Sequence, residues 1–160
     1  MNPNPTIDQK LDVLIKIAKL FNKYQVLWHV GASCMLYLRG YVPHFKDIDL
    51  MIGMGEVNKV KRILSKYTFH ERQANEQYQT KVFLEYEIDG IDIDIMAGFA
   101  IVHNEKVYEF PLTIQEPYDE LLLDDQVIYL SKVETWLKYY RLMNREDKVK
   151  LIENHIGHHR

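Results

Sequence analysis

The sequence contains little cysteine, glycine or proline, and it has no long apolar run. A single cysteine, Cys34, excludes a disulfide framework and any zinc or redox site built on a CxxC pair. Seven glycines and five prolines are too few for a collagen-like or linker-like chain. No apolar stretch approaches the ~18 residues of a membrane-spanning helix. The N-terminus lacks the basic and apolar regions of a secretory signal, so we expect a cytoplasmic protein with no membrane association.

An excess of charge of either sign is also missing. Twenty Lys and Arg residues stand against 23 Asp and Glu residues, giving a formal net charge of −3. This balance argues against a generic DNA- or RNA-binding protein. The 47% of hydrophobic residues can supply one compact core, and no repeat or linker divides the chain. We therefore predict a single domain over residues 1–160, with a core of about 7–115 and a C-terminal helical part of about 131–156.

Hydrophobic periodicity predicts helices at both ends of the chain. Thr6 and Gln9 have the spacing of a capping box, and apolar residues then recur at helical spacing. Ser131 and Glu134 have the same spacing near the C-terminus. The expected helices span residues 7–24, 34–38, 57–67, 133–142 and 147–155.

Short apolar segments between these helices are typical of strands. They cover residues 26–30, 47–52, 81–88 and 91–96. The dipeptide Asp89-Gly90 predicts a hairpin between the last two, and Asn104-Glu105 allows another from 99 to 110. The sum is an α+β fold, with a mixed or antiparallel β-sheet flanked by helices and further helices at the C-terminal end.

Acidic residues alternate with aliphatic residues on two of the predicted strands. Asp47 and Asp49 share one face of the first strand, and Asp92 and Asp94 share one face of the second. Asp is disfavoured in strands and like charges repel, so the pattern indicates a cation. Carboxylate oxygens suit Mg²⁺ or Mn²⁺, and three of them can hold the ions used in phosphoryl transfer. The alternative is a solvent-exposed face of an ordinary sheet.

A turn of small residues precedes the first acidic pair. Val30-Gly31-Ala32-Ser33 is expected where a strand ends and a helix begins, and backbone N–H groups at such a place attract phosphate. Gly31 permits close approach of a ligand, and the Ser33 hydroxyl can donate to a phosphate oxygen. Alone, this segment could be a plain tight turn. Followed by Asp47-Ile48-Asp49, it predicts a site for a triphosphate held through metal ions.

This combination resembles the signature of the nucleotidyltransferase superfamily with the DNA polymerase β-like fold. The signature consists of a hydrophobic residue, Gly, then Gly or Ser, a later Asp-hydrophobic-Asp segment, and a third acid on another strand. Residues 39–47 are similar to the segment before the acidic pair in small bacterial lincosamide-type nucleotidyltransferases. The stretch Arg145-Glu146-Asp147-Lys148 is similar to their C-terminal helical part. Ala32 departs from the pattern, since it separates Gly31 from Ser33.

The resemblance implies an enzyme that moves an NMP group from an NTP, such as ATP, to a hydroxyl acceptor. Asp47 and Asp49 would ligate Mg²⁺ or Mn²⁺. Asp94, with Asp92 in reserve, would be the third metal-ligating acid and would help to deprotonate the acceptor. We prefer Asp94 because the segment that follows it resembles the family's small-residue exit from the strand.

The resemblance further implies that Gly31 and Ser33 bind the triphosphate. Arg39 and Lys46 flank the loop before the acidic pair and are additional nucleotide-binding candidates. The acceptor is expected to be a small molecule or a protein, with a tRNA end as a further option, and a homodimer or a helical partner protein stays open. One alternative function is a non-catalytic or weakly catalytic binding or antitoxin module. Another is a structural α+β protein.

Overall fold

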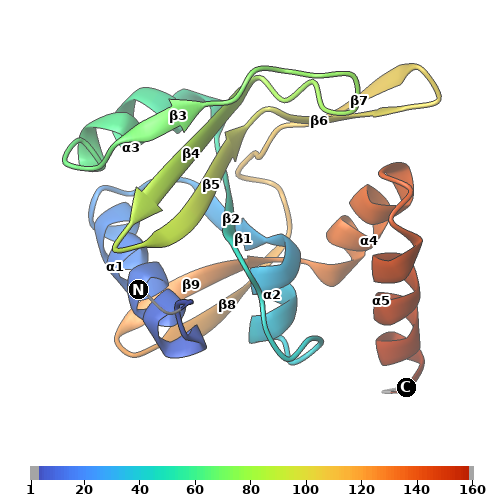
Figure 1. The fold of residues 1–160 in the computed structure, drawn as a ribbon, viewed down its shortest axis with the longest axis horizontal. Coiled ribbons are helices and arrows are strands. Elements are labelled where there is room, and N and C mark those ends of the chain that lie inside the picture. Colours follow the sequence, from blue (N-terminus) through green and yellow to red (C-terminus); the bar gives the residue numbers. More distant parts are fainter. Residues whose placement is uncertain (1–3, 159–160) are drawn as a thin grey trace.

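A mixed seven-stranded sheet organises the chain in the computed structural model, which describes residues 4–158 (Figure 1). Its strand order is β3-β4-β5-β2-β1-β9-β8, and β6 and β7 form a separate hairpin. The strands are β1 (Trp28–Gly31), β2 (Ile48–Ile52), β3 (Phe69–Glu71), β4 (Val82–Ile88), β5 (Ile91–Ala97), β6 (Phe99–His103), β7 (Lys106–Phe110), β8 (Tyr118–Leu123) and β9 (Gln126–Ser131). Parallel pairing of β2 with β5 and of β1 with β9 makes the sheet mixed.

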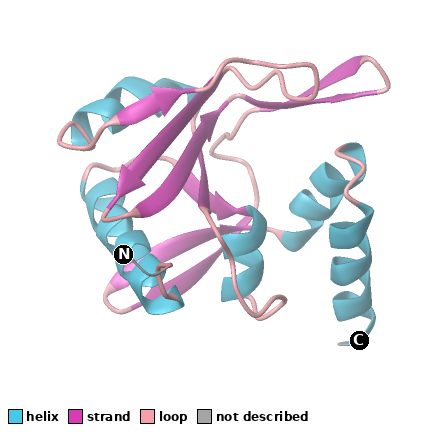
Figure 2. Cartoon of the chain, in the orientation of Figure 1, coloured by secondary structure: helices cyan, strands magenta, loops and turns pink. Residues whose placement is uncertain are grey.

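Helices precede, interrupt and follow the strands, as expected for an α+β fold (Figure 2). They are α1 (Ile7–Lys23), α2 (Ala32–Leu38), α3 (Val57–Ile63), α4 (Val133–Leu142) and α5 (Glu146–His158), with a 3₁₀ turn at Met54–Glu56. In Figure 1, α4 and α5 lie beside each other at the opposite end of the molecule from α1 and α3. The His103 ring contacts the Leu142 carbonyl at 3.0 Å, which ties the β6–β7 hairpin to this helix pair.

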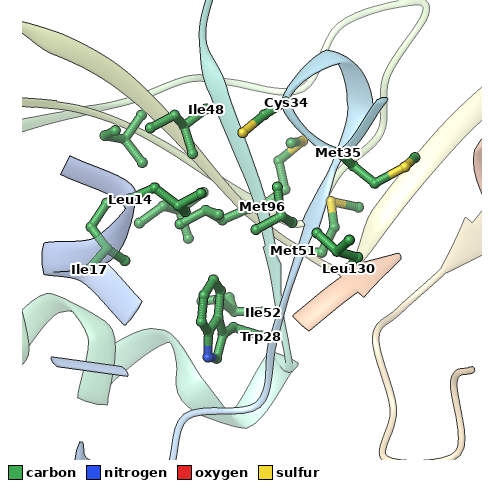
Figure 3. Packing of buried hydrophobic residues seen from close by; sticks show 14 of the residues in the cluster. Leu14, Ile17, Trp28, Cys34, Met35, Ile48, Met51, Ile52, Met96 and Leu130 are labelled. Carbon is green, nitrogen blue, oxygen red and sulfur yellow. The ribbon is translucent and has the colours of Figure 1, made fainter. Parts of the chain in front are cut away.

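The first helix supplies much of the core and begins as predicted. Thr6 accepts a hydrogen bond from the Gln9 backbone, and the Gln9 side chain accepts one from the Thr6 backbone, so the capping box is confirmed. The buried side chains of α1 recur at helical spacing, and they are Val13, Leu14, Ile17, Ala18 and Phe21. Figure 3 shows Leu14 and Ile17 beside the buried residues of β1 and β2.

Both predicted hairpins are present. Asp89 and Gly90 have φ values of 51° and 80°, the left-handed conformation that a tight hairpin turn requires, and they join β4 to β5. Asn104 and Glu105 have φ values of 51° and 65° and join β6 to β7. The hairpin between β4 and β5 fixes the position of the second acidic segment relative to β4.

Two expectations about the elements are wrong, and one hairpin was not predicted. The helix predicted to run to residue 67 ends at Ile63. Ser131 does not cap α4, because it is the last residue of β9 and the N-cap is Lys132, without a side-chain bond. The hairpin of β8 and β9 was not foreseen, and it extends the sheet beyond residue 115 by pairing β9 with β1.

Helices long and apolar enough to cross a bilayer do not occur among the described residues.

Candidate active site

Strand pairing brings the predicted acids into one row across the sheet. Gly31 on β1 pairs with Asp49 on β2, Asp49 pairs with Asp94 on β5, and Asp94 pairs with Glu85 on β4. Side chains at paired positions lie on the same face of a sheet and are close neighbours. Two segments more than forty residues apart therefore place their carboxylates side by side.

A second acidic row lies one step further along the same face. Asp92 on β5 pairs with Glu87 on β4, and Asp47 precedes the first residue of β2 on the side of Asp92. Asp47 is partly exposed and Asp92 is exposed. The face of the sheet from β2 to β4 is thus strongly acidic at this end, and Arg72 is paired with Glu85 at 2.7 Å.

The acids of the candidate site raise one another's pKa. Burial and the neighbouring carboxylates of Asp94 and Asp47 hold the pKa of Asp49 well above its usual range. Burial and then Asp47 raise the pKa of Asp94 to about 6. Burial and then Asp92 raise the pKa of Asp47. Each ionised form is therefore disfavoured in the protein alone, and a cation at this place would reverse the effect.

Asp94 lies closer to Asp49 than Asp92 does. Asp94 is partly buried and its side chain lies within hydrogen-bonding reach of Asp49, whereas Asp92 is exposed in the outer row. The donor set of carboxylate oxygens with mutually raised pKa values suits a hard divalent cation. Among residues 4–158, no three His, Cys, Asp or Glu side chains are gathered closely enough to form a metal cage as they stand.

Gly31 is required by close packing. Its backbone is extended, with φ −126° and ψ −170°, a conformation open to other residues. A Cβ atom added there would meet ring atoms of Trp136 at 2.4–2.6 Å. Trp136, on α4, is 3% exposed, and its indole nitrogen has no hydrogen-bond partner among the described residues. The turn is therefore pressed against the C-terminal helix pair.

The next two residues of the turn are held by backbone conformation and by a hydrogen bond, respectively. Ala32 has a φ of 52°, in the left-handed region that costs a residue with a Cβ atom about 1–2 kcal/mol. The Ser33 hydroxyl accepts a hydrogen bond from Lys148 Nζ at 3.1 Å. Tyr140 on α4 also lies within hydrogen-bonding reach of Ser33, and it lies close enough to Asp49 for that carboxylate to help raise its pKa.

Lys148 and Tyr140 were not among the site residues predicted from sequence. Lys148 belongs to the stretch 145–148 whose resemblance to the C-terminal part of the family was noted, and that was the available signal. No periodicity or spacing could show that α5 returns to the turn, because the contact spans 115 residues.

The two other nucleotide-binding candidates lie apart from the turn. Arg39 donates to Asp119 at 2.8 Å and to the Ser131 carbonyl at 2.7 Å, so it fastens α2 to β8 and β9. Lys46 is exposed and lines a second cavity, which Asp47 and Asp92 also border. The structure thus brings Gly31, Ser33 and the acids together and leaves Arg39 in a structural ion pair.

A cleft of about 390 Å³ opens beside the acids, on the side of β3 and β4. Its lining includes Asp47, Asp92 and Asp94, together with Arg72, Glu85 and Phe69. A cavity of this size is suited to a small molecule.

Known proteins share this architecture. No protein-family model matches the sequence, and no curated protein resembles it significantly. Among solved structures, a proposed nucleotidyltransferase from Thermotoga maritima superposes with a TM-score of 0.76 at 21% identity, over 97% of each chain. The chain has the nucleotidyltransferase fold.

Two further structures with the nucleotidyltransferase fold are similar. The lincosamide antibiotic adenylyltransferase LnuA, bound to lincomycin, gives a TM-score of 0.61 at 15% identity, over 94% of this chain and 98% of that one. ANT(2")-Ia, in complex with adenylyl-2"-tobramycin, gives 0.60 at 12% identity, over 94% and 91%. The expected fold is therefore confirmed along nearly the whole chain.

Proposed function

We propose that the protein is a metal-dependent nucleotidyltransferase that moves an NMP group from an NTP to a hydroxyl group of a small molecule. The observation that supports this most directly is the register of Gly31, Asp49 and Asp94 across β1, β2 and β5. Carboxylates whose pKa is raised by burial and by neighbouring acids, placed beside a turn of small residues, are costly in an empty scaffold. They are useful where a cation and a phosphate must meet.

Asp47, Asp49 and Asp94 would hold the metal. When bound, a divalent ion supplies charge that offsets the carboxylates and the developing charge on the transferred phosphate. Gly31 keeps the turn free of a side chain, and the Ser33 hydroxyl can donate to a phosphate oxygen. Because ionised Asp94 is disfavoured in the protein alone, with a pKa of about 6, a cation is expected to bring it fully into the carboxylate form.

The proposed reaction is an attack by the acceptor oxygen on the α-phosphorus of the NTP. A bond forms between these two atoms, the bond from the α-phosphorus to the bridging oxygen breaks, and pyrophosphate leaves with that electron pair. The hydroxyl proton passes to Asp94, the third of the acids proposed to hold the metal. The remaining contribution of the protein is to position the groups and to stabilise charge.

The cleft beside Asp94 is where we place the acceptor. It borders Asp94 directly and is large enough for a drug-sized molecule. The neighbouring structures hold lincomycin and adenylylated tobramycin, which are hydroxyl-bearing small molecules. The acidic wall of this cleft favours an acceptor that carries positive charge.

Nucleotide binding measured by calorimetry tests the proposal. Wild-type protein should bind ATP or another NTP in Mg²⁺ and should lose that binding in EDTA. Asp49→Asn should remove the dependence on Mg²⁺, whereas Asp125→Asn, in the exposed turn between β8 and β9, should behave like wild type. Equal binding of every NTP with and without the metal would refute the metal-dependent mechanism. If NTP binding does depend on Mg²⁺, measuring pyrophosphate release with a panel of amino sugars and lincosamides would identify the acceptor.

A further inference from the structure

A lysine from the C-terminal helix reaches the turn that is expected to bind phosphate. Lys148 Nζ donates to Ser33 Oγ at 3.1 Å, and the side chain is partly buried. The residue lies in the first turn of α5, which begins at Glu146. A cation is disfavoured there because the N-terminal end of a helix carries partial positive charge.

The ammonium group of Lys148 has no carboxylate partner. Asp147, the nearest acid in sequence, is occupied by Arg145 through two hydrogen bonds of 3.2 and 3.1 Å. No ion pair within 4.0 Å joins Lys148 to an acid among the described residues, and a neutral hydroxyl is its hydrogen-bond acceptor. Partial burial and the neighbouring Arg145 lower its pKa, and the negative charge of Asp147, which is bound to Arg145, offsets this only in part.

We propose that Lys148 binds the polyphosphate chain of the nucleotide. The ammonium donates to Ser33, and phosphate oxygens of a bound NTP would be further acceptors for it. The identity of the ligand rests on the proposed function, whereas the preference of this position for an anion rests on the contacts of Lys148 itself. After transfer, the same ammonium would contact the departing pyrophosphate.

Tyr140 connects the two halves of this arrangement. Its hydroxyl is buried, which raises its pKa, and Asp49 and Ser33 are both near enough to affect that pKa. The carboxylates on β2 and β5 therefore adjoin one side of the turn, and Lys148 contacts its serine. This division assigns the metal to the sheet and the terminal phosphates to α5, so the C-terminal helix pair is part of the nucleotide site.

Binding of inorganic tripolyphosphate in EDTA tests Lys148 without the metal. We compare wild type with Lys148→Met, Lys148→Arg and Lys150→Met, the last being an exposed lysine on the same helix. Since a hydrogen bond to a charged group contributes about 1.5–3 kcal/mol, Lys148→Met should weaken binding by roughly 10- to 100-fold. Lys148→Arg should recover part of the loss, and Lys150→Met should change binding by less than about twofold. Circular dichroism establishes that each variant is folded.

The outcomes separate this proposal from the proposed function. If Lys148→Met binds tripolyphosphate as tightly as wild type, or if wild type does not bind it at all, the assignment of Lys148 is wrong. If tripolyphosphate binding depends on Lys148 but no NTP binds in a metal-dependent way, the assignment stands and the nucleotidyltransferase proposal fails. In an active enzyme, Lys148→Met should raise the KM for the NTP, a change that Lys150→Met should not produce.

Discussion

The two sides of the candidate active site bear different kinds of energetic cost. On the side of β2 and β5, Asp49 and Asp94 are paired across the strands, and burial followed by neighbouring carboxylates raises the pKa of each, so the cost is electrostatic. On the side of the turn, Gly31 is pressed against Trp136 and Ala32 has a positive φ, so the cost is steric. A bound cation and a change of pH can relieve the first cost. Neither can relieve the second.

This difference shows how one fold can prepare two tasks. Under the proposed function, repulsion among the carboxylates would leave a place where a cation binds favourably. Tight packing of the turn against α4 would fix the backbone where the phosphate is to be positioned. Variants on the two sides should therefore differ in their response to metal and pH, and the following predictions test that distinction.

The largest effect is expected for catalysis by Asp49→Asn. By analogy with other preorganised electrostatic groups, removing this carboxylate should lower NMP transfer by about a hundredfold or more. Asp92→Asn should cost less than Asp94→Asn, because Asp92 is exposed in the outer row. Rates of pyrophosphate release with saturating Mg²⁺ measure these losses. An equal loss for the Asp92 and Asp94 variants would contradict the choice of Asp94 as the third acid.

Gly31→Ala should give the largest loss of stability. The new methyl group would lie 2.4–2.6 Å from the indole of Trp136, and overpacking of this kind costs typically about 1–3 kcal/mol. Urea unfolding at pH 5 and pH 8, with and without Mg²⁺, should show the same loss under every condition. Gly55→Ala is the matched control, since nothing lies within 4 Å of a Cβ atom there. A loss that varied with Mg²⁺ would show that the two sides are coupled.

Asp94→Asn should stabilise the protein, in contrast to Gly31→Ala, and the gain in stability should depend on pH. The pKa of Asp94 is about 6 in the folded protein and 3.8 as its ordinary value, so the folded state binds the proton more tightly. Below pH 3.8 the Asp94 carboxyl does not change the free energy of unfolding, because it is protonated in both states. As the pH rises through 6, its ionisation destabilises the folded protein. Asp94→Asn should therefore stabilise the metal-free protein at pH 7.5 by about 1 kcal/mol, allowing for partial exposure, and by nothing near pH 4.

Mg²⁺ and a remote variant provide the controls for this pH effect. Adding Mg²⁺ should stabilise wild type more than Asp94→Asn, because the ion relieves the same repulsion that the substitution removes. Asp125→Asn, which is exposed and far along the chain from the acids, should follow wild type at every pH. Thermal unfolding in EDTA and in Mg²⁺ measures both. A destabilised Asp94→Asn protein in EDTA would show that the carboxylate is satisfied without a cation.

Local chemistry made part of the fold predictable. The capping box of Thr6 and Gln9 and the turn at Asp89-Gly90 depend on residues adjacent in sequence, and both are confirmed. The β8–β9 hairpin was missed because its central residues, Leu121 to Leu123, do not alternate with polar residues. The capping box at Ser131 was wrong because pairing within the sheet takes this residue into β9.

The candidate site also depends on contacts between residues far apart in the sequence, which local patterns do not predict. Alternation showed which face Asp49 and Asp94 occupy, but their register depends on the parallel pairing of β2 with β5, a long-range contact. The contact of Lys148 with Ser33 likewise depends on how α5 packs. Arg39 lay close to the motif in sequence, yet its side chain points to Asp119, because proximity along a chain does not fix direction.

The smallest effect is expected for Ala32→Gly, which changes the steric strain in the turn and no charge. Ala32 has a φ of 52°, a conformation that glycine adopts without the clash of a Cβ atom. Ala32→Gly should therefore stabilise the protein by about 0.5–1 kcal/mol, the difference that remains after glycine's greater freedom in the unfolded chain is subtracted. Ala18→Gly, in the buried face of α1, should destabilise it instead. Because no charge changes, urea unfolding should give the same gain at pH 5 and pH 8 and in EDTA and Mg²⁺. A gain confined to one of these conditions would mean that the strain in the turn is maintained by the carboxylates rather than by packing against α4.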